Sequence, residues 1–586
     1  MSKLYLRVGV VLIALLAWGL TACAPAPTPV PPPAPTTAAQ PTSAPQPTAA
    51  PQPTTAPQAT TAAPTTAPTT AATAAPTKAA ATTAPSGGAA GTLVVVDDIS
   101  DMISVDPAVS YEFNGDLVVH QAYETLVKFE GADLSNLKPG LATKWDVKDA
   151  GSTWDLTFTL RSDAKFASGN PVTSADVVYS FQRVLSLNKS PAFLFSDIAQ
   201  LKPDSFKAPD PQTVVISLPK TVGPQEFLAI LTFSVGSVVD STVVKTHVTG
   251  NDFGSAWLLD KSAGSGPYVI DHWTKETEVS LKANPNFATK PATSAVLIKH
   301  VPDPNNQLAS LLKGDADIAR NLSPEQINSL KGKPDVTTAT GDNLQLVYVG
   351  MNVAVKPLDN PDVREALRTA VDYDGILNAL LSGNGRKMQA IIPAGLAGAN
   401  TDTPFQQNIT AAKALLAKAG QDKGFTLELL VPTGQAPGGA AYADIAAKLQ
   451  SDWSKVGVTI NIKQTTQAEL LGSYRAQKGQ LVLILWGPDF PDPDANGGPF
   501  TDYAAKSIAY RNSWDDKSIA AKARDAALVA DPAKRAAAYK DVTDYVLHNG
   551  PYVILYQPRE QFGLRTTVKN FVWSPIGWTD FWLIGK

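Results

Sequence analysis

Apolar residues recur at helical spacing in three stretches of the second half of the chain. The first stretch, 360–371, opens with Asn-Pro-Asp, a combination typical of a helix start. The second begins at Thr410 and the third covers 442–456, and each is followed by a glycine that can close a helix. The pattern predicts three amphipathic helices.

Strand patterns lie between and before these helices. Residues 458–462 alternate apolar and polar positions, as a half-buried strand does, whereas 481–485 is a continuous apolar run that suits a strand covered on both faces. Residues 154–160 also alternate, and a capping-box pattern at 173–176 then predicts another helix. The alternation of helix and strand predicts an α/β fold with largely parallel sheets, and a more antiparallel arrangement near 154–160.

The first 22 residues have the pattern of a targeting signal peptide. Lys3 and Arg7 give a positive start, and 8–20 is an apolar stretch too short to span a bilayer comfortably. It ends in Leu-Thr-Ala-Cys, which resembles the bacterial lipobox, so cleavage before Cys23 and lipidation of its thiol are expected. The alternative is an ordinary secretory signal with an incidental cysteine. Because Cys23 is the only cysteine of the chain, lipidation is favoured, and a disulfide framework or a cysteine-based metal site is excluded.

Residues 23–91 are expected to form a lipidated cysteine and a disordered tether. The stretch is almost entirely Ala, Pro and Thr, with Lys78 as its only charged residue and no aromatic residue. Such a composition cannot bury enough apolar surface to offset the ordering of the backbone. As a flexible coil the tether would span about 45 Å, and as extended polyproline II about 210 Å.

Residues 92–586 form the predicted folded part. The chain has a net charge of −4 and no cluster of Lys and Arg, which argues against nucleic acid as a partner. After Cys23 no stretch is apolar for long enough to cross a membrane, so the lipid is expected to be the only membrane attachment. The five histidines are scattered, and no H-E-x-x-H pair, nucleophile elbow or phosphate loop occurs. The sequence favours a protein that is not an enzyme and holds no metal or cofactor.

Several short motifs occur in order across this folded part. They are Tyr-Glu-Thr-Leu-Val at 123–127 with Lys-Pro-Gly-Leu-Ala at 138–142, the block 160–181, Gly-Ser-Gly-Pro-Tyr at 264–268, the Gly-acid-x-Asp turn within 311–317, and Met-Asn at 351–352 with Pro-Asp-Val-Arg at 361–364. Together they resemble the family of extracellular solute-binding proteins of ABC importers that includes the oligopeptide- and dipeptide-binding proteins (bacterial family 5).

The resemblance implies a two-lobed α/β architecture of the periplasmic-binding-protein type (type II), with an additional α/β subdomain in the first lobe. The first lobe is expected to be discontinuous. Its expected parts are 92–126, 268–345 and 549–586, with the additional subdomain at 127–267 and the second lobe at 346–548.

The function implied is that of a lipid-anchored, extracytoplasmic binding protein that acts as a monomer. It would capture a small solute between its lobes by hinge closure and deliver it to an ABC permease. Short peptides are the first candidate solute and oligosaccharides the second. A hypothesis from another class is a surface glycan-binding protein that serves no transporter.

The candidate binding residues lie in one loop, Trp-Gly-Pro-Asp-Phe-Pro-Asp-Pro at 486–493, directly after the apolar run 481–485. A strand that leaves the core can deliver such a loop to a cleft. In peptide-binding relatives the acid three residues after this Trp pairs with the α-ammonium of the ligand. The resemblance therefore implies that Asp489 holds the amine, that Trp486 packs beside the ligand, and that Phe490 is a third contact.

Two other interpretations of this loop stay open. Asp489 is also an ordinary turn former in a proline-rich loop. The stretch 492–497 could begin a calcium loop, but Tyr503 stands where such a loop needs a glutamate.

Two further candidates lie outside this loop. Tyr123 belongs to the first of the family motifs, and Arg386 follows two glycines and could meet a ligand carboxylate, although a solvated loop is the alternative. His300 is expected at an exposed strand position without a functional role.

Overall fold

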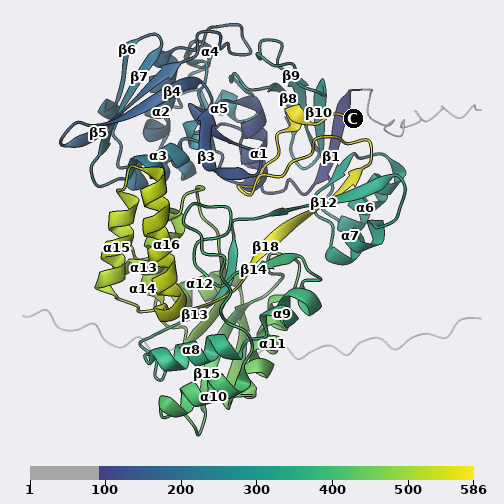
Figure 1. The fold of residues 1–586 in the computed structure, drawn as a ribbon. Helices are drawn as coiled ribbons and strands as arrows, with labels where there is room; N and C mark the ends of the chain where they lie inside the picture. The colour runs from purple at the N-terminus through teal and green to yellow at the C-terminus, as the bar shows by residue number, and fades with distance from the viewer. Residues whose placement is uncertain (1–90) are drawn as a thin grey trace, which may run out of the picture. The chain divides into compact units, whose positions relative to one another are not determined.

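The computed structural model of the protein describes residues 91–586, and one long strand, β18 (Tyr552–Arg565), runs through both of its sheet regions (Figure 1). The predicted signal peptide, Cys23 and the predicted tether up to residue 90 lie outside the described residues. Within 91–586, no helix has the length and apolar character needed to cross a membrane.

The first sheet region is built around β1 (Thr92–Asp97). β1 pairs in parallel with β10 (Ala295–His300) and β11 (Ile318–Ala319), and β9 (Glu278–Ala283) and β8 (Tyr268–Thr274) continue the sheet in antiparallel order. Alternate β1 side chains enter two cores. Leu93 and Val95 pack with α1 (Phe113–Ala122), and Val94 and Val96 pack with α6 (Pro304–Lys313) and α7 (Pro324–Leu330).

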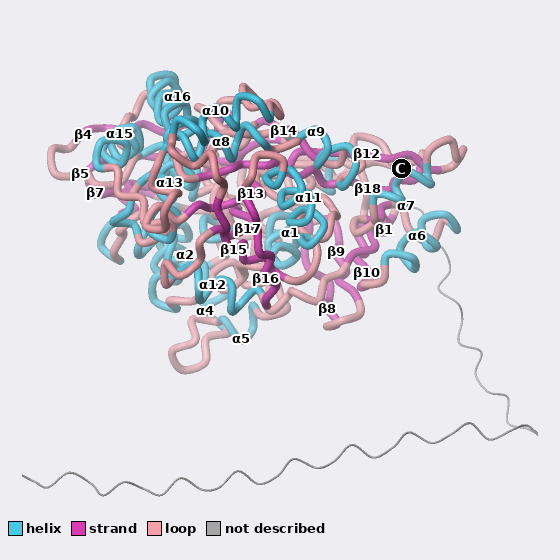
Figure 2. Tube along the Cα trace, turned by 90° about the horizontal axis from the view of Figure 1, so that it is seen from below, coloured by secondary structure: helices cyan, strands magenta, loops and turns pink. Residues whose placement is uncertain are grey.

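The second sheet region has the strand order β16 (Val458–Thr465), β15 (Phe425–Pro432), β17 (Leu481–Trp486) and β13 (Leu346–Met351), followed by β18. Figure 2 shows these strands one after another from below. Helices cover both faces of this sheet. One face packs against α8 (Pro361–Ala370), α10 (Ile409–Lys418) and α11 (Tyr442–Ser454). The other packs against α12 (Gln467–Arg475), α13 (Asp494–Thr501), α14 (Ile508–Arg511), α15 (Lys517–Ala527) and α16 (Pro532–Asn549). The short elements α9 (Tyr373–Gly375) and β14 (Gly385–Lys387) lie between α8 and α10 in the chain.

The chain crosses between the two regions at 343–345 and again within β18. β12 (Val336–Asp342) ends with Asp342 paired to Arg559, and β13 then pairs Val347 with Tyr556. The backbone N–H of Asn343 donates to the carbonyl oxygen of Pro558 at 3.1 Å, which ties the two crossings together. We call 91–342 with 559–586 lobe I, and 346–556 lobe II.

Between α1 and β8 the chain adds an inserted subdomain to lobe I. Its strands are β2 (Val127–Glu130) paired with β3 (Asp133–Pro139), and a four-stranded antiparallel sheet in the order β4 (Ala142–Asp149), β5 (Thr153–Leu160), β7 (Thr213–Pro219), β6 (Phe206–Asp210). Its helices are α2 (Ser174–Leu187) and α3 (Pro224–Ile230), whereas α4 (Ser241–Thr246) and α5 (Ser255–Leu258) pack in the core around β1 and α1. The chain leaves the subdomain through the Gly-Ser-Gly motif, where a Cβ on Gly266 would lie 2.5 Å from the carbonyl carbon of Ala122. This close approach explains the glycine.

The local sequence predictions are confirmed. Asn360 caps α8, Gly457 follows α11 with a φ of +85°, and Thr173 and Asp176 form the reciprocal capping box of α2. In β5 the apolar residues at 156, 158 and 160 are buried in the core of the subdomain, and the strand is antiparallel to both of its neighbours.

The expectation of largely parallel sheets is wrong, because both regions are mixed. In lobe II, β15 is parallel to β16 and β17, but β13 is antiparallel to both β17 and β18. A buried apolar run marks a strand without fixing its direction, and here β18 runs back from lobe II to lobe I. The expected boundary at residue 549 also differs from the point where β18 changes partners, between Tyr556 and Arg559.

Candidate ligand-binding site

A cavity of about 400 Å³ lies between the lobes and receives side chains from both. Lobe I contributes Tyr111 and Asp116 near the start of α1, and lobe II contributes the loop after β17 that contains Asp489. A second, smaller pocket in lobe I shares Asp116, Phe233 and Trp578 with this cavity. The predicted binding loop therefore faces an interlobe cavity.

Asp489 has one hydrogen bond across the cleft. The Tyr111 hydroxyl donates to its Oδ1 at 2.6 Å, and no side chain or backbone donor within 91–586 reaches Oδ2. Burial raises the pKa of Asp489 above its ordinary value, and the Tyr111 hydroxyl acts in the opposite direction. The carboxyl group can thus accept a further donor from a ligand while it remains bonded to Tyr111.

The other two candidates of this loop have different surroundings. Trp486 is not among the residues that line the cavity; its Nε1 donates to the carbonyl oxygen of Ala495 at 3.2 Å, and its ring meets Phe500 edge to face at 6.1 Å. Phe490 lines the cavity with one part and packs in the core of the inserted subdomain with the rest, being only 6% exposed. Phe490 thereby joins the two lobes.

Tyr123 and Arg386 do not line this cavity, and Arg386 lines a separate one that also receives residues from both lobes, among them Asp342. Tyr123 follows α1, is buried, and accepts a hydrogen bond from the backbone N–H of Ala263 at 3.2 Å; it lines only the smaller pocket. Arg386 belongs to β14 instead of a loop, and its guanidinium forms an ion pair with Asp342 at 2.8 Å. Asp342 also pairs with Arg559, at 3.0 Å, so Arg386 belongs to a group of charges shared by the two lobes.

The two lobes also touch far from the crossing strands. Figure 1 shows α3 of the inserted subdomain above α15 and α16 of lobe II. The side-chain amide of Gln225 donates to the carbonyl oxygen of Ala530 at 2.9 Å. The neighbouring Glu226 is 6% exposed, and burial together with the nearby Asp494 and Asp492 raises its pKa well above the ordinary value.

The acids that suggested a calcium loop have protein partners. Asp492 forms a buried bidentate pair with Arg535, at 2.6 and 2.7 Å. Asp494 accepts from the Tyr539 hydroxyl at 2.6 Å. In the described part of the chain, no group of three or more His, Cys, Asp and Glu residues is arranged to hold a metal ion.

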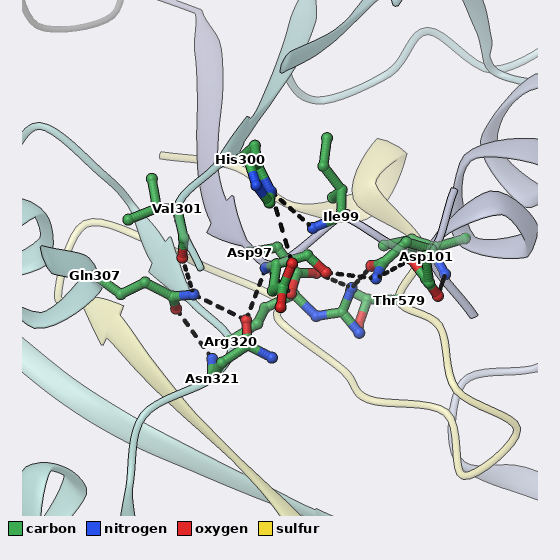
Figure 3. Close-up of polar contacts among 12 residues, drawn as sticks. Asp97, Ile99, Asp101, His300, Val301, Gln307, Arg320, Asn321 and Thr579 are labelled. Carbon is green, nitrogen blue, oxygen red and sulfur yellow. Dashed lines mark hydrogen bonds and ion pairs between the residues drawn. The ribbon is translucent and has the colours of Figure 1, made fainter. Parts of the chain in front are cut away.

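The sequence predicted an exposed strand position for His300, and this prediction is wrong. Its side chain is 14% exposed, and its Nδ1 accepts from the backbone N–H of Ile99 at 3.3 Å (Figure 3). It belongs to a polar network at the carboxyl ends of β1, β10 and β11, in which Arg320 pairs with Asp97 at 2.7 Å. The strand pattern missed this because His300 is the last residue of β10, where its side chain contacts the segment that follows β1.

Sequence reasoning missed the lobe I side of the cavity. Tyr111, Asp116, Phe233 and Trp578 come from distant parts of the chain and carry no recognisable motif. The one available signal was the run of tryptophans near the C-terminus, among which Trp578 stacks on His120 at 4.5 Å.

Comparison with known proteins decides the family. The sequence model of the bacterial extracellular solute-binding proteins, family 5 Middle, matches residues 136–507, which is more than half of the chain. The chain belongs to this family. A model of Mucin-7 also matches residues 16–225, a range that includes the whole Ala-, Pro- and Thr-rich stretch.

Individual relatives of this family 5 protein cover most of its length. It is 30% identical over 495 residues to the probable D,D-dipeptide-binding periplasmic protein DdpA of Escherichia coli (strain K12), a match over 83% of this chain and 92% of that protein. It is 28% identical to the dipeptide-binding protein of the same organism, over 78% of this chain and 87% of that one. The structure of HbpA2 from Haemophilus parasuis covers 84% of this chain and 99% of its own, with 25% identity and a TM-score of 0.76.

These matches confirm the predicted fold class. The family 5 protein has the two-lobed type II architecture with an additional subdomain in its first lobe. It is an extracytoplasmic solute-binding protein and not an enzyme.

Proposed function

We propose that the protein captures short peptides in the interlobe cavity, with the peptide α-ammonium bound to Asp489. The observation that supports this most is that Asp489, an exposed residue of lobe II, lines a cavity whose other wall is lobe I, with Oδ2 free to accept. A ligand that touches both lobes favours the state in which they are closed around it. The names of the two Escherichia coli relatives, which refer to dipeptides, agree with this ligand class.

The oligosaccharide alternative has less support from the cavity. Sugar binding usually needs aromatic rings whose faces are open to the ligand. Trp578 is 7% exposed and one of its faces is covered by His120. Phe113, 69% exposed, is the more accessible ring in the cavity wall, but it offers no polar group to a sugar hydroxyl.

A pair of peptides tests the proposed function. We expect a free tripeptide to bind in titration calorimetry, and its N-acetylated form to bind at least about tenfold more weakly. The acetylated peptide lacks the charge that faces Asp489. Because burial raises the pKa of Asp489, its carboxylate can take up a proton when no cation faces it, and this limits the loss of affinity. Equal affinities for the two forms would contradict the assignment of Asp489 to an amine. Binding of an oligosaccharide without any binding of peptides would replace the peptide proposal.

We further propose that Cys23 is lipidated, that residues 24–91 tether the lobes to the membrane, and that a closed, loaded form docks on an ABC permease. The lipobox-like sequence before the sole cysteine supports the first part, and the composition of the stretch supports the second. The third part rests on membership of a family of solute-binding proteins.

Replacement of the cysteine tests the anchor. Cys23→Ser removes the thiol that would carry the lipid. We expect the variant either to appear in the soluble extracytoplasmic fraction or to accumulate as an uncleaved precursor, measured by fractionation and intact mass. A variant that stays in the membrane fraction at the mature mass would show that the anchor lies elsewhere.

A further inference from the structure

Two carboxyl groups line the interlobe cavity, one from each lobe, and neither has a basic partner. Asp489 comes from lobe II and Asp116 from lobe I. Among the described residues that line this cavity there is no lysine, arginine or histidine. Burial raises the pKa of the Tyr111 hydroxyl, and both carboxyl groups lie near enough to add to this rise. The cavity therefore carries acidic groups on both walls.

Asp116 is the less satisfied of the two. Its residue is 5% exposed, and no hydrogen bond reaches its Oδ1 within the described part of the chain. The hydroxyls of Ser234 and Ser110 lie close enough to the carboxyl group to oppose the rise that burial gives its pKa, but neither bonds to Oδ1. The other carboxyl groups of the adjoining smaller pocket do have partners: Glu124 pairs with Arg161 and Asp580 with His120, each at 2.8 Å. A buried carboxyl oxygen without a donor is unusual in a folded protein, and a ligand can supply what is missing.

We propose that Asp116 is a second ligand-binding carboxyl group, which takes the cationic side chain of a lysine or arginine in the bound peptide. The inference rests on the proposed function, because the same peptide places its amine at Asp489. Asp116 lies in the first turn of α1, where the helix dipole favours a negative charge once a cation faces it. The rings of Phe113 and Phe233 line the same cavity and can cover the methylene groups of such a side chain.

The ionisation of Asp116 gives this binding a pH dependence of known sign. Burial raises its pKa well above the ordinary value, Glu112 and Asp101 add to the rise, and the hydroxyls of Ser234 and Ser110 oppose it. A bound cation favours the ionised form and lowers the pKa, so binding releases protons. The preference for a basic peptide over a neutral one should therefore grow as the pH rises.

The experiment compares Ala-Lys-Ala with Ala-norleucine-Ala, which differ mainly in the terminal ammonium of the side chain. For the unaltered chain we expect the lysine peptide to bind at least about tenfold more tightly. In Asp116→Asn the ratio of the two affinities should fall to near one. The same substitution at the exposed Asp515, which lines none of these cavities, should keep the ratio of the unaltered chain.

The outcomes separate this inference from the proposed function. If both peptides bind, and acetylation weakens both, but their affinities are equal, then the assignment of Asp116 is wrong and that of Asp489 stands. If neither peptide binds, the proposed function is wrong, and the inference about Asp116 is wrong as well because it rests on that function.

A second measurement needs no variant of Asp116. Calorimetric titrations of the unaltered chain in two buffers with different ionisation enthalpies report the protons exchanged on binding. We expect the lysine peptide to release more protons than the norleucine peptide. Identical proton exchange for the two peptides would contradict a raised pKa that the cation lowers.

Discussion

Asp489→Asn should weaken the binding of a free peptide by at least about thirtyfold, a loss of roughly 2–5 kcal/mol. The substitution preserves the shape of the side chain and an oxygen that can accept from Tyr111. It removes the negative charge, so the α-ammonium of the ligand would be buried without its counter-ion. The α-ammonium of a peptide has an ordinary pKa of about 8, so its neutralisation costs only about 1 kcal/mol at pH 7 but about 2.7 kcal/mol at pH 6, and the affinities are therefore compared at pH 6.

Titration calorimetry of one peptide that binds well, against the unaltered chain and the three variants Asp489→Asn, Trp486→Ala and Asp515→Asn, tests this prediction. The unaltered chain gives the reference, and Asp515→Asn controls for an aspartate-to-asparagine change at an exposed site. Trp486→Ala should cost less than Asp489→Asn, because its ring packs inside lobe II and loses apolar contact instead of charge. An unchanged affinity in Asp489→Asn would mean that the amine binds elsewhere.

Asp106→Asn should lower the free energy of unfolding by about 3–5 kcal/mol. Asp106 and Arg183 form a bidentate pair at 2.7 and 2.6 Å, and their side chains are 0% and 1% exposed. The pair ties α2 of the inserted subdomain to the segment that precedes α1. Asparagine keeps one oxygen that can accept from Arg183, but an amide NH2 group replaces the other carboxylate oxygen, so the buried guanidinium loses its counter-ion and one of its two bonds to residue 106 while it keeps the carbonyl oxygen of Phe253, at 2.8 Å.

Urea unfolding followed by tryptophan fluorescence measures this loss. Asp515→Asn, which removes one side of an exposed pair with Lys517, should change the free energy by less than about 1 kcal/mol. The double variant Asp106→Leu with Arg183→Met should be more stable than Asp106→Asn, because it leaves no charge unpaired. A loss of less than about 1 kcal/mol in Asp106→Asn would show that the buried charge is compensated in some other way.

Some of the candidate site was accessible to sequence reasoning. The loop at 486–493 was found because it follows a buried strand and because its Trp and Asp have the spacing of peptide-binding relatives. The structure places Asp489 of this loop in an interlobe cavity. The partner of Asp489 could not be found in this way, since Tyr111 lies 378 positions earlier in the chain.

The same limit applies to Asp116. It occupies the first turn of an ordinary helix, and its sequence context gives no sign that it faces another lobe. Its Oδ1 is buried without a hydrogen-bond partner only because α1 packs against its neighbours in the folded protein. The ion pair of Arg386 with Asp342 is a further contact that could not be found from the sequence.

The sequence by itself determined the local elements and the family. Caps such as the Thr173–Asp176 box, the helix periods and the buried run 481–485 act over a few residues, so their consequences can be worked out from neighbours in the chain. The tertiary structure alone decided the directions of the strands, the change of partners within β18, and the pairing of lobe I with lobe II side chains around the cavity. These depend on contacts between residues hundreds of positions apart. Their free energies come from burial and charge in the assembled lobes, and no short stretch of sequence carries that information.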